Sequence, residues 1–152
     1  MIETYVKWED DTKNILVETE IPFEVKIGEI TFTGRIDRLE KNPEGKYEVV
    51  DFKSGSSVKS KNKAKIDPQL NIYAIAVEKL KGELPVKASL FYVEKDKMVD
   101  YVVSKESVDE AMESIKQMTV EILKENFDAT PSFAACKFCS YQTICDAKII
   151  DE

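Results

Sequence analysis

The sequence predicts an α/β domain in which a mixed β-sheet is flanked by helices. Five segments have the alternation or the continuous apolar character of strands, and two helical segments lie between and after them. Elements in this order pack as layers around one sheet. No repeat or linker divides the 152 residues. We therefore expect a single domain over residues 1–152, with its core at about 15–126 and a cysteine-rich tail at 131–152.

The first three strands are expected close together in the chain. Residues 15–27 and 30–39 alternate apolar with polar side chains. A turn rich in Asn, Pro and Gly at 42–45 leads into the third strand-like run at 46–53. Residues 1–14 are polar and weakly periodic, which leaves two alternatives, a short helix or an irregular lead-in.

The second half begins with a well-marked helix. Asp67 is a typical N-cap residue, Pro68 suits the first helical position, and Gly82 is placed to end the helix. The remaining predicted elements are strands at 86–93 and 98–103 and a long amphipathic helix at 104–126.

Composition limits the classes of function. The net charge of −7 argues against a surface that binds nucleic acid everywhere, although charge acts locally. The chain contains no histidine, which excludes histidine-based acid–base catalysis, histidine triads and histidine-ligated zinc. No apolar run approaches the roughly 20 residues of a membrane span, and no signal-peptide pattern is present. We expect a cytoplasmic protein without a membrane partner.

Two acids and a lysine in the second and third strands are suited to cutting a phosphodiester. Asp51 and Lys53 are two residues apart, so their side chains share one face of a strand. If 30–39 pairs with 46–53 as a hairpin, Asp37 can lie beside Asp51, and adjacent carboxylates repel unless a cation joins them. Mg²⁺ and Mn²⁺ prefer such oxygen ligands, and a metal there can neutralise phosphate charge and activate water. Ordinary surface ion pairs are the alternative.

Two further features adjoin this group. Gln69 and Tyr73 are four residues apart and share one face of the predicted helix. The loop before the helix contains no acid between Asp51 and Asp67 and leaves directly from the strand of Lys53. We expect its lysines to bind DNA phosphates, with a merely solvated loop as the alternative. These lysines are Lys59, Lys61, Lys63 and Lys65.

Four motifs together resemble the RecB-like branch of the PD-(D/E)XK nuclease superfamily. They are Gly34-Arg35-Ile36-Asp37, Asp51-Phe52-Lys53-Ser54-Gly55, Gln69-Leu70-Asn71-Ile72-Tyr73-Ala74 and the cysteine tail. The branch includes nuclease domains of helicase-nucleases and CRISPR-associated RecB-like exonucleases, and the resemblance covers roughly residues 18–146. It implies a restriction-endonuclease-like fold and a Mg²⁺- or Mn²⁺-dependent DNA nuclease, an exonuclease or single-strand nuclease. It further implies a role in DNA repair or recombination beside a helicase domain or subunit.

The resemblance also implies roles for individual residues. Asp37, Asp51 and the backbone carbonyl of Phe52 match the metal ligands, and Lys53 matches the catalytic lysine. Members of the family usually begin with a helix that carries a further ligand, and we expect that helix to be absent here. The Gln-x3-Tyr motif that supports the active site and contacts the DNA strand is matched by Gln69 and Tyr73, and the nearest replacement acid is Glu20.

All three cysteines lie in the tail, as Cys136-x2-Cys139-x5-Cys145. Such crowding in an intracellular chain indicates a metal more than a disulfide. Relatives with a 4Fe–4S cluster take three cysteines from a tail of this spacing and one from before the core, and that fourth cysteine is missing here. An iron–sulfur cluster, zinc, and empty thiols or a disulfide all remain open.

The alternative to a nuclease is a non-catalytic, iron–sulfur-bearing module that binds DNA but has lost efficient cleavage. A structural domain whose tail merely binds metal is a third reading. No segment looks like a base-reading element, so we expect DNA binding without sequence specificity. Neither a phosphate-binding loop nor a helicase motif is present, so any unwinding has to come from elsewhere.

Overall fold

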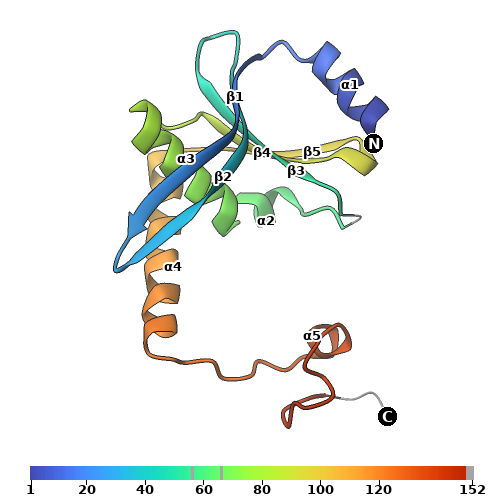
Figure 1. Cartoon of the computed structure of the whole chain (residues 1–152), viewed down its shortest axis with the longest axis vertical. Coiled ribbons are helices and arrows are strands. Elements are labelled where there is room, and N and C mark those ends of the chain that lie inside the picture. The colour runs from blue at the N-terminus through green and yellow to red at the C-terminus, as the bar shows by residue number, and fades with distance from the viewer. Residues whose placement is uncertain (56, 66, 150–152) are drawn as a thin grey trace. The chain divides into compact units, whose positions relative to one another are not determined.

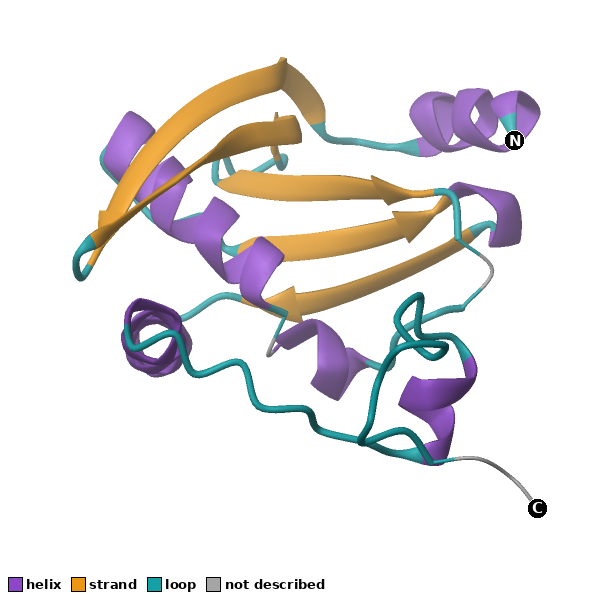
Figure 2. Cartoon of the chain, turned by 60° about the horizontal axis from the view of Figure 1, so that its bottom comes forward, coloured by secondary structure: helices purple, strands orange, loops and turns teal. Residues whose placement is uncertain are grey.

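The computed structural model describes residues 1–55, 57–65 and 67–149, and within them one five-stranded sheet accompanied by helices (Figures 1 and 2). The elements are α1 (Ile2–Asp11), β1 (Ile15–Ile27), β2 (Ile30–Lys41), β3 (Tyr47–Lys53), α2 (Lys61–Lys65), α3 (Pro68–Lys81), β4 (Lys87–Tyr92), a 3₁₀ turn (Val93–Lys95), β5 (Lys97–Val102), α4 (Lys105–Leu123) and α5 (Phe133–Lys137).

The strands lie in the order β1-β2-β3-β4-β5. Neighbours are antiparallel except β3 and β4, which are parallel and are connected through α2 and α3. A parallel pair needs such a crossover, because a tight hairpin can only join antiparallel strands. The predicted mixed sheet flanked by helices is confirmed. Residues Met1–Thr119 form one unit that holds the sheet, and Val120–Glu152 form a second that holds the cysteines. That both act as one domain stays a prediction.

Helix α3 forms where its end signals predicted it. The Asp67 carboxylate accepts the Gln69 backbone N–H at 2.9 Å, and Gly82 ends the helix with a φ of 81°. Its buried stripe, which includes Leu70 and Val77, packs in the main core against one face of the sheet (Figure 2). No helix among the described residues is long and apolar enough to cross a membrane.

The N-terminal residues adopt the first of their two predicted alternatives. Helix α1 buries none of its residues, but Tyr5 and Trp8 pack beside Phe52 and Phe91 on the sheet face opposite the main core. The ring centroids of Trp8 and Phe91 are 5.0 Å apart. The separate expectation that the family's ligand-bearing first helix is absent stays a prediction.

Strand β2 changes face near Asp37. Ile36 and Leu39 are both fully buried in the main core although they are three residues apart, whereas a regular strand alternates its faces. Between them, Arg38 lies on the α1 side of the sheet. In the neighbouring strand β1, the residue opposite Asp37 is Glu20, whose φ is 51°. Both strands are therefore irregular at the row that contains the candidate acid.

Arg38 is a buried charged residue of β2 whose hydrogen bonds hold α1 against the sheet. It is 1% exposed, and its guanidinium donates to Glu40 at 2.6 Å, to Glu9 at 3.0 Å and to the Tyr5 hydroxyl at 3.0 Å. It also lies 4.9 Å from the centre of the Trp8 ring. A buried charge is tolerated when it is paired and hydrogen-bonded in this way.

We expect Arg38→Met to lower the free energy of unfolding by about 3–5 kcal/mol, because Glu40 would be left buried and unpaired. Urea unfolding at neutral pH measures the change. Arg35→Met is the matched control on the same strand, since Arg35 is exposed and its ion pair with Glu20 is 3.9 Å long. It should change stability by no more than about 0.5 kcal/mol. Equal losses in the two variants would contradict a structural role for the buried network.

Candidate active site

The two predicted ligand acids meet where β2 and β3 separate. The antiparallel ladder ends at the pair Arg38–Val50, and one more step of the same register would place Asp37 opposite Asp51. Pairing stops there, and Asp37 Oδ2 accepts the Phe52 backbone N–H at 2.9 Å. The predicted hairpin is thus observed, and it brings both acids to one end of the ladder.

Asp51 is a buried carboxylate that pairs with Lys53. Its side chain is 2% exposed, and its Oδ2 lies 2.7 Å from Lys53 Nζ. Burial is the main cause that raises the pKa of Asp51 above its usual range; Lys53 opposes this effect, and the charges of Asp37 and Asp67 add to it. A bound cation would favour the ionised form of this group.

A chain of hydrogen bonds leads from Lys53 to helix α3. The Lys53 ammonium donates to Gln69 Oε1 at 2.7 Å, and Gln69 Nε2 donates to the Tyr73 hydroxyl at 2.9 Å. Burial raises the pKa of Tyr73 most strongly; the Gln69 bond lowers it and nearby carboxylates, Asp51 first, raise it. The phenol therefore stays protonated near neutral pH, and its own proton is available to an acceptor. Its ring is buried while its hydroxyl lies at the site.

Glu20 lies beside this group without a contact to it. Its side chain is 66% exposed and pairs with Arg35 at 3.9 Å. In the register of β1 and β2, Glu20 falls opposite Asp37, between the pairs Thr19–Arg38 and Ile21–Ile36. Its charge contributes to the raised pKa of Tyr73. A direct role for Glu20 as a metal ligand stays a prediction.

The acids suit a magnesium-type ion more than a closed cage of protein ligands. Within residues 1–55, 57–65 and 67–149, no three Asp, Glu, Cys or His side chains are grouped closely enough to hold a metal ion. Mg²⁺ is usually bound by one or two carboxylates and completes its shell with water and substrate phosphate. The Asp37 and Asp51 carboxylates, which lie together where β2 and β3 separate, fit that requirement.

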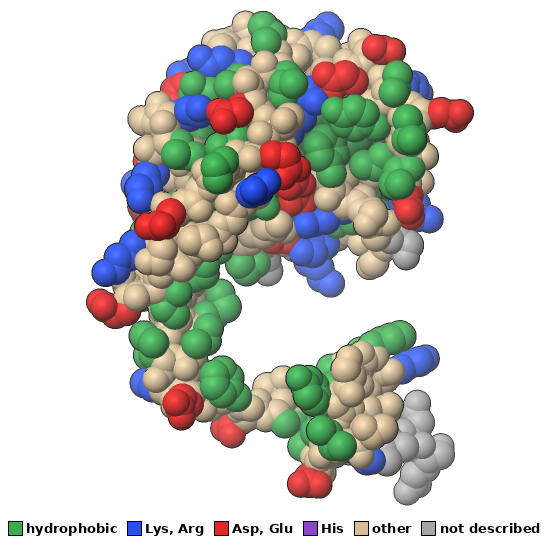
Figure 3. All heavy atoms as spheres, viewed as in Figure 1, with side chains coloured by type: hydrophobic (Ala, Val, Ile, Leu, Met, Phe, Trp, Pro, Cys, Tyr) green, Lys and Arg blue, Asp and Glu red, His purple; other side chains and the backbone are tan. Residues whose placement is uncertain are grey.

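The predicted lysine loop is partly helical. Lys59 is held by the Asp67 carboxylate, and its backbone N–H donates to the Tyr92 hydroxyl at 3.0 Å. The next residues form α2 because Ala64 is fully buried and Asn71 Nδ2 caps the Lys65 carbonyl at 2.9 Å. Side chains of Lys and Arg gather in Figure 3 where Figure 1 places α2. Three predicted DNA-binding lysines are exposed there, Lys61, Lys63 and Lys65.

The three cysteines of the tail lie in and after α5. Cys136 is buried in α5, Cys145 is half-buried and Cys139 is exposed. The Cys136 sulfur accepts the Ile149 backbone N–H at 3.5 Å. None of the three belongs to a metal-binding group among the described residues, and no disulfide joins them. Iron–sulfur or zinc ligation stays a prediction.

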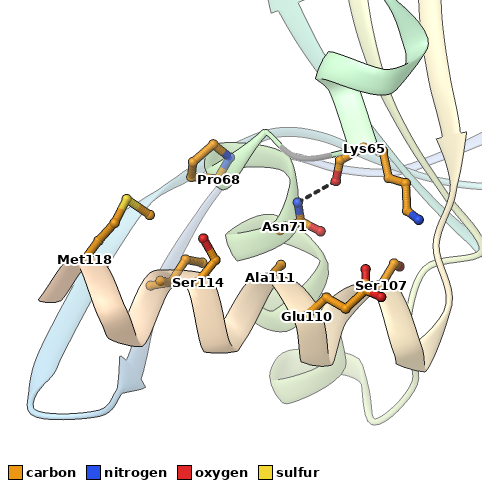
Figure 4. Close-up of a pocket in the computed structure, with 9 residues that line it drawn as sticks. Lys65, Pro68, Asn71, Ser107, Glu110, Ala111, Ser114 and Met118 are labelled. Atoms are coloured by element: carbon orange, nitrogen blue, oxygen red, sulfur yellow. Dashed lines mark hydrogen bonds between the residues drawn. The ribbon is translucent and has the colours of Figure 1, made fainter. Parts of the chain in front are cut away.

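Two hollows adjoin α3, and only one of them reaches the site. A cavity of about 120 Å³ lies between α3 and α4 (Figure 4), but its buried polar residues already have partners: Asn71 bonds to Lys65, Asp67 and Tyr101, and Ser107 donates to the Ser104 carbonyl. The larger hollow, about 320 Å³, includes Gln69 and Tyr73 among its lining residues. We call it the Gln69 groove. Sequence reasoning missed it, although the glycine inside β2, at position 34, is a signal of close backbone approach.

Comparison with known proteins agrees with this fold. The family model described as the PD-(D/E)XK nuclease superfamily matches residues 1–146. Among solved structures, the crystal structure of SSO0001 superimposes with a TM-score of 0.56 and 22% identity, over 98% of this chain and 68% of that one. At this identity the likeness concerns the fold alone. No curated protein matches the chain. Since the family model covers nearly the whole sequence, the chain belongs to the PD-(D/E)XK nuclease superfamily.

Proposed function

We propose that the chain is a Mg²⁺- or Mn²⁺-dependent deoxyribonuclease of the RecB-like branch, an exonuclease or single-strand nuclease. One observation supports this most directly. Asp37, Asp51 and Lys53 converge where two strands separate, and the Asp51 carboxylate is buried beside the second acid, with Lys53 at 2.7 Å from its Oδ2. Burial and the charge of Asp37 both disfavour ionised Asp51, and a bound cation is what stabilises two acids placed in this way.

Each residue then has a chemical task. Asp37, Asp51 and the Phe52 carbonyl would hold the metal, which supplies charge neutralisation on the phosphate and a more acidic bound water. Lys53 carries its positive charge at the same place and is positioned by Asp51 and Gln69, so it can stabilise negative charge that develops on the phosphate. The Tyr73 hydroxyl can donate its proton in a hydrogen bond to the DNA strand.

The proposed substrate is single-stranded DNA or a DNA end, cut without sequence specificity. Exposed lysines on α2 can contact phosphates, and such contacts carry no sequence information. The proposed setting is cytoplasmic DNA repair or recombination, with a helicase domain or subunit as partner and an iron–sulfur cluster on the tail cysteines. These finer features rest on the RecB-like motifs and on the three tail cysteines.

A non-catalytic DNA-binding module is the second candidate. It is favoured by one observation, namely that the described residues offer two carboxylates at the site and no third metal ligand within a grouped set. The two candidates differ in a single assay. A nuclease cuts single-stranded DNA with Mn²⁺ and stops when a chelator is added, whereas the non-catalytic module binds the same DNA and leaves it intact in both conditions.

We expect Asp51→Ala and Lys53→Ala to abolish Mn²⁺-dependent cleavage of single-stranded DNA while circular dichroism shows an intact fold. Loss of one charge-stabilising group of this kind lowers a rate by roughly 10² to 10³. Lys46→Ala is a matched control, because Lys46 precedes the same strand but pairs with Glu83 on the surface. Undiminished cleavage by either site variant would refute the assignment.

Without metal, Asp51→Asn should make the protein more stable at pH 7. Because folding raises the Asp51 pKa, its favourable contribution is complete below the unfolded pKa of about 3.9 and is lost as pH rises through the folded pKa. Asparagine cannot ionise, so the variant avoids that loss. Urea unfolding in chelator should give Asp51→Asn a higher free energy of unfolding than the wild type at pH 7, and this difference should disappear toward about pH 4. Asp10→Asn, at an exposed position on α1, should unfold with the wild-type free energy at both pH values.

Replacing the three exposed lysines of α2 by glutamine should weaken single-stranded DNA binding and reduce its salt dependence. Each phosphate contact in single strands contributes about 0.7 to the slope of log K against log salt, so the slope should fall by about 2. Anisotropy titrations at several salt concentrations measure it. An unchanged slope would assign the lysines to the solvated-loop alternative. The control replaces three lysines that pair with acids near them in sequence, Lys105, Lys116 and Lys124.

A further inference from the structure

The Gln69 groove is uncharged although it adjoins a charged site. Its lining side chains are aromatic, aliphatic or neutral polar, and none is ionisable near neutral pH. A phosphate would need cations or several strong donors at such a place. The lining residues are Phe23, Phe32, Thr33, Gly34, Gln69, Ile72 and Tyr73.

Close packing at Gly34 builds the floor of the groove. Gly34 pairs with Phe23 across β1 and β2, and a Cβ on Gly34 would lie 2.9 Å from the Phe23 ring. The missing side chain lets that ring lie against the β2 backbone. The same ring meets the Tyr73 ring edge to face, with centroids 5.7 Å apart. Phe23 and Tyr73 are buried, whereas Phe32 and Ile72 are half-buried and present part of their apolar surface to an occupant.

Gln69 connects this floor to the candidate catalytic lysine. Its amide oxygen accepts from Lys53 at 2.7 Å, and its amide nitrogen donates to the Tyr73 hydroxyl at 2.9 Å. A phosphodiester that contacts Lys53 is therefore separated from the groove only by the Gln69 side chain. The group attached to that phosphate is a nucleoside, and its base is neutral, planar and able to pack on aromatic rings.

We propose that the Gln69 groove binds the unstacked base of a nucleotide beside the phosphate held at Asp51 and Lys53. This proposal rests on the proposed nuclease function and names the substrate class for the same site, single-stranded DNA. Apolar walls, a volume of about 320 Å³ and a few neutral polar groups are typical of a small-ligand pocket. A base in a duplex reaches such a pocket only after it leaves its stack, which is unfavourable, whereas a single strand offers the base freely.

The experiment compares two charge-matched ligands, an oligothymidylate of about ten nucleotides and an abasic strand with the same number of phosphates. Fluorescence anisotropy in chelator measures binding without cleavage. The wild-type chain should bind the thymine strand about tenfold more tightly, as one or two stacked bases would give. Phe32→Leu removes a ring and keeps an apolar side chain. Ile72→Ala, at a half-buried lining position on α3, removes apolar surface from the opposite wall and tests the same point.

Leu80→Ala is the matched control, because Leu80 is exposed on the same helix as Ile72 and does not line the groove. In Phe32→Leu and Ile72→Ala the tenfold preference should fall toward one, with abasic binding unchanged, while Leu80→Ala keeps it. A wild-type preference that survives both groove variants overturns the proposal, as does equal binding of the two strands by a wild-type chain that still cuts thymine DNA. A wild-type chain that neither binds nor cuts either strand overturns the nuclease function itself.

Discussion

The Asp37 carboxylate accepts a backbone hydrogen bond that a carbonyl of the neighbouring strand would otherwise accept. The geometry of the site depends on this bond. At the end of the β2–β3 ladder, the Phe52 N–H is bound by a side chain instead of a backbone carbonyl. An unmatched buried N–H would be costly, so this bond lets the strands separate without leaving a donor unpaired. The separation makes room at the row of Asp51 and Lys53 and aims Asp37 toward it.

The two central strands hold two buried charges with opposite arrangements. Arg38 has acceptors for its guanidinium and an aromatic ring beneath it, so its charge is fully compensated. Asp51 lies one position past the last ladder pair and has an ion pair with Lys53, while burial and the charge of Asp37 both raise its pKa. The first arrangement stabilises the docking of α1. In the second, a bound cation would offset the repulsion between Asp37 and Asp51. The buried charge therefore indicates a structural role at Arg38 and ligand binding at Asp51.

What could be predicted from the sequence was local, and what was missed depends on tertiary packing. Alternation located the first strands, and the Asp67 and Gly82 end signals located α3 to the residue. The Arg38 network could not be foreseen, because its partners come from α1 and from its own strand. The lysine segment was predicted as a loop. It becomes α2 only because Ala64 is buried and a side chain of α3 caps its end.

Gln69 shows how the site and its neighbouring groove depend on one orientation of an amide. Only one of the two flips presents oxygen to the Lys53 ammonium and nitrogen to the Tyr73 hydroxyl; the other would place an N–H against an ammonium. The Tyr73 ring is fixed in turn by Phe23, whose place over Gly34 no larger residue at position 34 would allow. The position of the candidate catalytic lysine is thus coupled, through one amide, to the packing that shapes the groove beside it.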